Sequence, residues 1–118
     1  MVLGDGTIVT GTSPRVDNHS VALCHETEPF CAAYRMRQPV AASVCLHRDP
    51  GGRLVVLSPC GVCRERLSVY GPEVLAAVAS IADPVAVVWK LLRDLLPDAW
   101  MTAFPEQLPP WARQTGQP

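Results

Sequence analysis

The sequence predicts an α/β domain in which a central sheet lies between helices. Short apolar runs typical of strands alternate along the chain with segments of helical spacing, and Pro or Gly residues separate them. The chain has 118 residues, of which 48% are hydrophobic, so it can bury the core of one domain. We find no internal repeat.

The first twenty residues predict a hairpin and a loop. Asp5-Gly6 is a turn signal between two short runs, of which 7–10 is the second strand. The polar stretch 12–20 contains Pro14 and predicts a loop.

Residues 26–38 predict the first helix, because Phe30, Ala33 and Tyr34 share one face and Pro39 ends it. Pro29 lies in the first turn, where its missing N–H costs little. After this helix, the apolar run 40–46 is typical of a strand covered on both faces.

The second half of the chain continues the alternation. It is divided by turn signals at 49–52, 58–61 and 71–72 and by Pro97. The predicted elements between them are a strand at 54–57, a helix at 62–70, a strand at 74–79 and a helix at 85–96. From residue 98 onward the prolines predict an irregular segment.

Composition argues against several classes of protein. The net charge of −1 and the single Lys90 disfavour binding to nucleic acid by phosphate neutralisation. No apolar run approaches the roughly 18 residues of a membrane span, and the N-terminus lacks the basic start of a signal peptide. We therefore expect a cytoplasmic protein without membrane partners.

Five cysteines need an explanation, because the count is odd and a reducing compartment disfavours disulfides. Cys60 and Cys63 lie three apart at a predicted helix start, where both sulfurs point to one place and the helix dipole favours thiolates. A catalytic zinc site takes three protein ligands, and Cys24, before the first helix, is the candidate third. Glu26 follows it by two residues, a spacing that suits a general acid and base which does not bind the metal.

The remaining candidates have simpler interpretations. Cys31 and Cys45 are expected in the core, on the first helix and on a strand. His25 as a metal ligand would need a glutamate at position 27, which is Thr27, so we do not expect it to bind zinc.

Cys24-His25-Glu26, followed by Pro59-Cys60-Gly61-Val62-Cys63-Arg64, resembles the zinc-dependent cytidine deaminase superfamily. The resemblance is strongest to its small, tetrameric, all-cysteine branch, which includes cytidine deaminases and blasticidin S deaminase. It extends to residues 5–11, similar to the family's first hairpin, and 94–100, similar to its Leu-Leu-Pro segment. It implies a three-layer α/β/α sandwich with a central mixed sheet over residues 1–104, and we expect residues 105–118 to form an irregular tail.

The resemblance also implies an activity and roles for residues. Cys24, Cys60 and Cys63 would hold Zn²⁺, and Glu26 would move protons while a cytosine base loses its amine as ammonia. The backbone at His25 would contact the base carbonyl. Trp100 would reach a neighbouring subunit's site in a homotetramer. Arg64 would hydrogen-bond a sulfur and offset the excess thiolate charge.

The chain departs from the family pattern in two places. Thr27 follows the predicted catalytic glutamate, where many cytidine deaminases have arginine. The family's ribose-binding Asn-x-Glu corresponds to Arg15-Val16-Asp17 at blasticidin S deaminase spacing, or to Ser13-Pro14-Arg15 at cytidine deaminase spacing. We therefore take Arg15 and Asp17 as candidate substrate-binding residues, and cytidine, deoxycytidine or a cytosine nucleoside analogue such as blasticidin S as candidate substrates.

Two alternatives remain open at this stage. A non-catalytic zinc module would use the metal only to hold two helices together, although such a site has no need of Glu26. A deaminase that edits polynucleotides would need more positive charge than this chain carries.

Overall fold

The structure is a computed structural model that describes residues 1–107. A four-stranded sheet has the order β1-β2-β5-β6, formed by Val2–Leu3, Val40–Ser43, Leu75–Val78 and Val88–Leu91. Strand β2 runs parallel to β5, and the other two pairings are antiparallel, so the sheet is mixed. The α/β class and the mixed central sheet are as predicted.

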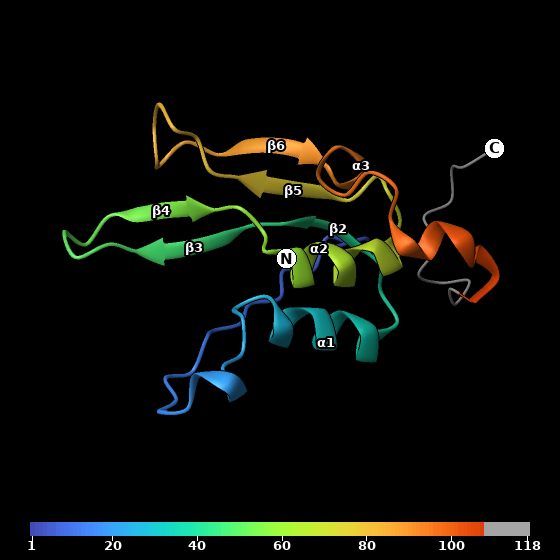
Figure 1. The fold of residues 1–118 in the computed structure, drawn as a ribbon, viewed down its shortest axis with the longest axis horizontal. Coiled ribbons are helices and arrows are strands. Elements are labelled where there is room, and N and C mark those ends of the chain that lie inside the picture. The colour runs from blue at the N-terminus through green and yellow to red at the C-terminus, as the bar shows by residue number, and fades with distance from the viewer. Residues whose placement is uncertain (108–118) are drawn as a thin grey trace.

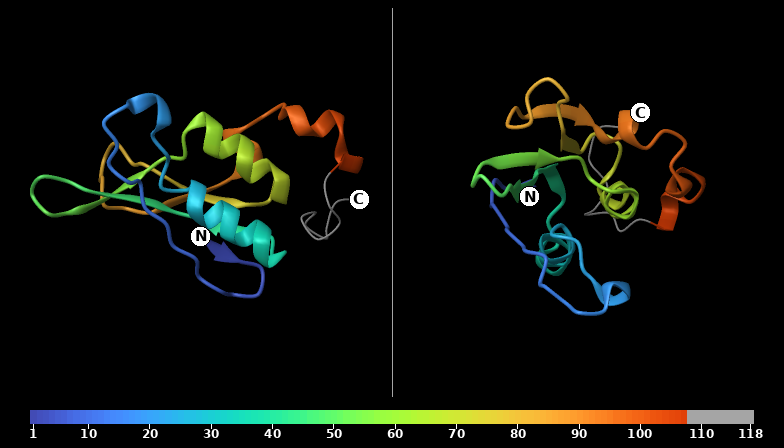
Figure 2. Two further views of the ribbon diagram at one scale, coloured as in Figure 1. Left: turned by 90° about the horizontal axis from the view of Figure 1, so that it is seen from below. Right: turned by 60° about the vertical axis from the view of Figure 1, so that its left-hand side comes forward.

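Two helices, α1 (Thr27–Met36) and α2 (Gly61–Leu67), lie side by side against the sheet (Figures 1 and 2). A core of fully or nearly fully buried side chains fills the space between them and the strands: Met1, Leu3, Ala33, Val40, Leu67, Tyr70, Val74 and Leu92. Phe30 of α1 meets the Tyr70 ring edge to face, with 5.8 Å between the ring centroids. This packing fixes the two helices relative to each other.

The predicted first hairpin forms at the N-terminus. Gly6 takes a positive φ of 87° in its turn, and the backbone of Val9 donates to the carbonyl of Met1. The second strand is shorter than predicted, since its pairing within the hairpin is a single bridge between Val2 and Ile8. A 3-10 turn, η1 (His19–Val21), interrupts the polar segment that follows.

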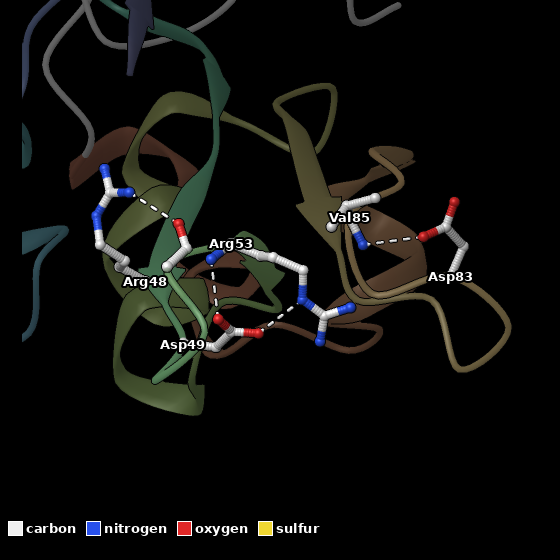
Figure 3. Close-up of polar contacts among 6 residues, drawn as sticks. Arg48, Asp49, Arg53, Asp83 and Val85 are labelled. Carbon is white, nitrogen blue, oxygen red and sulfur yellow. Dashed lines mark hydrogen bonds and ion pairs between the residues drawn. The ribbon is translucent and has the colours of Figure 1, made fainter.

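The apolar run 40–46 does not stay in one sheet. It divides at Val44, and β3 (Cys45–Arg48) pairs with β4 (Leu54–Leu57) in a hairpin that projects from the main sheet (Figure 1). Asp49 closes its turn by accepting from the backbone and side chain of Arg53, both at 2.9 Å (Figure 3). In the β5–β6 connection, Asp83 accepts from the backbone of Val85 (Figure 3).

The predicted helix over 85–96 is wrong. Residues 88–91 form β6, which pairs with β5 at four positions, and only Leu92–Leu95 make the short helix α3. The branched and aromatic side chains of Val87, Val88 and Trp89 favour a strand, and β6 satisfies the backbone groups that β5 would otherwise leave open at its edge. The predicted helix 62–70 is confirmed as far as Leu67, after which it tightens into the 3-10 turn η2 (Ser68–Tyr70).

The chain beyond α3 contains two further 3-10 turns, η3 (Trp100–Ala103) and η4 (Pro105–Gln107). The predicted tail from 105 to 118 lies mostly outside the described residues, so this boundary stays a prediction. Within the described part, no helix has the length and apolar character to cross a membrane.

Burial of Tyr70 gives a testable pH dependence. Burial raises the pKa of the Tyr70 hydroxyl to about 12, from an ordinary value near 10. The folded state favours the neutral phenol. The contribution of this hydroxyl to the free energy of unfolding is therefore complete below about pH 10 and is lost as the pH rises to about 12. We expect the parent to lose about 2 kcal/mol more stability than Tyr70→Phe between pH 9 and 12, measured by urea unfolding. Equal losses in the two proteins would contradict this.

Candidate metal centre and active site

Three cysteine sulfurs meet where α1 and α2 begin. The Sγ atoms of Cys24, Cys60 and Cys63 all lie within 4.8 Å of one another, and those of Cys24 and Cys63 are 3.3 Å apart. Cys24 precedes α1 by three residues, Cys60 caps α2, and Cys63 lies in its first turn. A tetrahedral Zn²⁺ with bonds of about 2.3 Å would place its sulfurs roughly 3.8 Å apart, so the donors and their spacing fit zinc.

The local chain geometry explains this convergence. The backbone N–H of Thr27 closes a turn onto the carbonyl of Cys24 at 3.0 Å, and that of Arg64 bonds the carbonyl of Cys60 at 2.9 Å. Pro59 precedes Cys60, which is extended and so marks the start of α2. The N-termini of two packed helices therefore carry all three sulfurs.

The protonation of the cysteines reflects their surroundings. The pKa of Cys60 is lowered, first by the backbone N–H of Cys63. Burial raises the pKa of Cys63, and hydrogen bonding to Cys24 and the charge of Glu26 raise it further. Metal binding must remove that proton, as it does for any thiol ligand.

Glu26 lies beside the cluster and is only 4% exposed. Its Oε1 accepts a hydrogen bond of 2.7 Å from the hydroxyl of Ser43, at the end of β2. A buried carboxylate held in this way has a fixed direction and an oxygen, Oε2, that Ser43 does not occupy. This geometry suits a group that takes up and releases protons.

Sequence reasoning did not single out Ser43, which is 2% exposed. No local motif marks it, because its importance comes from the pairing of β2 with the sheet and the packing of α1 above it. Cys45, two residues later, is buried as predicted, and burial raises its pKa to about 11.

Cys31 is exposed, so its predicted place in the core is wrong. Pro29 and Ala33 are the buried positions of α1, and Phe30 is partly buried. Cys31 follows Phe30 and is therefore rotated from it by about 100° around the helix. Tyr34 is also 51% exposed, which corrects its predicted place on the buried face. Neither side chain belongs to the cysteine cluster.

Arg64 does not hydrogen-bond a sulfur. Its Nε donates to the carbonyl of Pro59 at 2.9 Å and its Nη1 to that of Leu95 at 3.0 Å. It therefore ties the segment before Cys60 to α3, a different task from the predicted one.

The candidate substrate-binding residues lie outside the cysteine cluster. Arg15 and Asp17 are exposed in the segment before η1, and His25 is half-buried. Trp100 is 63% exposed and contacts Phe104 with a ring tilt of 46° and 5.0 Å between the ring centroids. Gly11 brings the chain against α1 so closely that a Cβ there would lie 2.8 Å from the carbonyl of His25. The segment that carries Arg15 and Asp17 thus starts beside the metal centre.

Known proteins share this sequence and fold. Although no family model matches the chain, cytidine deaminases from two Mycobacterium tuberculosis strains (CDC 1551 / Oshkosh and H37Rv) are each 33% identical to it. Each alignment covers 84% of this chain and 68% of the relative. The crystal structure of the cytidine deaminase from Bacillus anthracis matches with a TM-score of 0.79 and 39% identity, over 90% of this chain and 75% of that one.

The fold and the three-cysteine centre define a zinc-dependent hydrolase of the α/β class. With these relatives and this structural match, the chain belongs to the cytidine deaminase family. The predicted fold, the predicted family and the predicted cofactor, zinc, are confirmed.

Proposed function

We propose that this protein hydrolyses the exocyclic amine of a cytosine nucleoside, giving the uracil form and ammonia. The observation that carries the proposal is the buried Glu26 carboxylate beside three converging cysteine sulfurs. The family relatives are cytidine deaminases, and cytidine is therefore the first substrate to test.

Each residue of the site would have a distinct role in the deamination. Cys24, Cys60 and Cys63 would hold the zinc ion, which would supply a water of lowered pKa as the nucleophile near pH 7. Glu26 would carry a first proton from water to N3 of the base, and then a second proton, from the hydroxyl formed at C4, to the leaving amine. The Ser43 hydroxyl holds Oε1 of Glu26 and leaves Oε2 to move the proton. Water adds at C4, the C4–N bond breaks, and ammonia leaves.

Substrate contacts are proposed from position alone. The His25 backbone would contact the base carbonyl, and Arg15 and Asp17 would meet the sugar or its replacement. Because neither of the latter side chains is an asparagine, an analogue such as blasticidin S stays a candidate beside cytidine and deoxycytidine.

The substrate is tested by following ammonia release from cytidine, deoxycytidine and blasticidin S with the zinc-loaded protein. Turnover of at least one, with the uracil-form product, is the expected result. Tight zinc binding without turnover of any of the three would favour a non-catalytic zinc module of the same fold. Single-stranded DNA and RNA serve as a fourth arm, for which we expect no reaction, given the net charge of −1.

We also propose a homotetramer in the cytoplasm. Trp89 and Trp100 are 46% and 63% exposed in one chain, and aromatic side chains of this size are common at subunit interfaces. Trp100 would then stack on the base in a neighbouring subunit's site. Sedimentation is expected to give four chains per particle, and a monomer at micromolar concentration would exclude this assembly.

The hydrogen bond from Ser43 predicts a defect limited to turnover. Ser43→Ala leaves Oε1 of Glu26 without its buried partner, and a hydrogen bond to a charged group contributes about 1.5–3 kcal/mol. We expect kcat to fall about 10- to 100-fold, with zinc content and KM little changed. Ser68→Ala is the matched control, because Ser68 is also a buried serine but donates to the carbonyl of Glu65. Similar kcat values for the two variants would contradict the assignment.

A further inference from the structure

Arg66 joins the two helices that carry the cysteines. From the last turn of α2, its Nη1 donates to the hydroxyl of Thr27 in the first turn of α1, at 2.8 Å. Both side chains are half-buried. In Figure 1 the two helices run side by side, and the hydrogen bond joins one to the other.

Arg66 has no anionic partner among the described residues. The salt bridges found there join Arg53 to Asp49 and Arg93 to Glu73. Arg64 is already bonded to two carbonyls. Arg66 is therefore a partly desolvated cation held by a neutral hydroxyl, an arrangement that costs free energy unless a negative charge lies nearby.

Sequence spacing places Arg66 and Thr27 near the metal centre. Arg66 follows Cys63 by three residues in α2, so the two share one side of that helix. Thr27 follows Cys24 by three residues, and its backbone N–H bonds the Cys24 carbonyl. Arg66 and Thr27 each follow a cysteine of the cluster by three residues, and the hydrogen bond between them joins the two cysteine-bearing segments.

The negative charge of the zinc-loaded cysteine site would be the counter-charge that Arg66 lacks. Three thiolates and one Zn²⁺ sum to a net charge of about −1. We propose that Arg66, oriented by Thr27, is the positive charge that offsets this excess and so raises zinc affinity. It is a positioning residue that does not touch substrate. The inference rests on the proposed zinc site.

A purely structural role for Arg66 is the alternative. A cation in the last turn of a helix interacts favourably with its carbonyl end, and the Thr27 contact could simply hold α1 against α2. That role predicts the same loss of stability with and without zinc. Charge compensation predicts a loss only in the zinc-loaded protein.

The test measures zinc affinity by competition with a chromogenic chelator, at fixed pH and ionic strength, together with the melting temperature of each metal-free protein. Arg66→Gln is expected to weaken zinc binding about 10- to 100-fold, as expected for the loss of a residue that supports metal ligands, with little change in metal-free melting. Arg66→Lys keeps the charge and is expected to stay within about threefold of the parent. Thr27→Val keeps the arginine without its orienting hydroxyl and is expected to lose affinity about threefold.

Arg48→Gln is the matched control, because it removes an exposed arginine on the β3–β4 hairpin and is expected to leave affinity unchanged. The inference is overturned if Arg66→Gln binds zinc within twofold of the parent, or if the glutamine and lysine variants lose affinity equally. If Arg66→Gln does not fold, unchanged affinity in Thr27→Val overturns it instead. A parent protein that binds no zinc would refute the proposed function itself, a result distinct from all of these.

Discussion

Glu26→Gln is expected to lower kcat about 10³- to 10⁴-fold while zinc remains bound at one ion per chain. The substitution keeps the size of the side chain and its acceptor for the Ser43 hydroxyl. It removes the carboxylate that would carry one proton to N3 and a second to the leaving amine. Because Glu26 is buried and is not among the three clustered cysteines, we expect the defect to lie in proton transfer and not in metal binding. The measurement is steady-state deamination alongside metal analysis.

Glu28→Gln is the matched control for this experiment. Glu28 is an exposed carboxylate two residues further along, in the first turn of α1. It accepts a hydrogen bond from the backbone of Thr12 at 3.3 Å. We expect its kcat to stay within about threefold of the parent, as is usual for a surface substitution. If Glu26→Gln kept full activity with zinc bound, the proposed mechanism would be wrong.

The metal centre could be predicted because its residues lie in two short segments, in each of which the spacing along the chain sets the local geometry. Two cysteines three apart at a helix start place their sulfurs together whatever the rest of the fold does. Glu26 follows Cys24 closely enough for one turn to fix their relation. The approach of Cys24 to the other two depends on how α1 packs against α2. The resemblance to the family predicted that Cys24 joins Cys60 and Cys63. The structure places the three sulfurs within 4.8 Å of one another.

Features that depend on tertiary partners were not predicted. Ser43 and Arg66 gain their importance from single contacts with residues 17 and 39 positions away. The 88–91 segment has an apolar pattern compatible with helix or strand, and the open edge of β5 decides between them. Cys31 and Tyr34 were misplaced because the buried stripe of α1 is narrower than its apolar composition suggests. In each case the local sequence does not say which part of the fold packs against the segment.

Cys63→Ala is expected to abolish both zinc binding and deamination. Cys63 is 1% exposed and lies against the sulfur of Cys24. Its loss would leave two of the three proposed ligands and a small cavity where the Cys63 sulfur lay. Metal bound to the native state alone stabilises it by about 4 kcal/mol when free zinc exceeds its dissociation constant 1,000-fold. We therefore expect chelation to lower the melting temperature of the parent by on the order of 10 °C. The same chelator should leave Cys63→Ala unchanged.

Cys31→Ala separates loss of a ligand from loss of a thiol. Cys31 is an exposed cysteine on α1, outside the cluster, so this variant should bind one zinc ion, respond to chelation like the parent and retain its activity. Melting is followed by circular dichroism with reductant present, since all five cysteines are unpaired. A Cys63→Ala protein that still melted at a zinc-dependent temperature would show that the metal sits elsewhere. A parent insensitive to chelation would contradict the prediction, because a metal that binds only the native state must stabilise it.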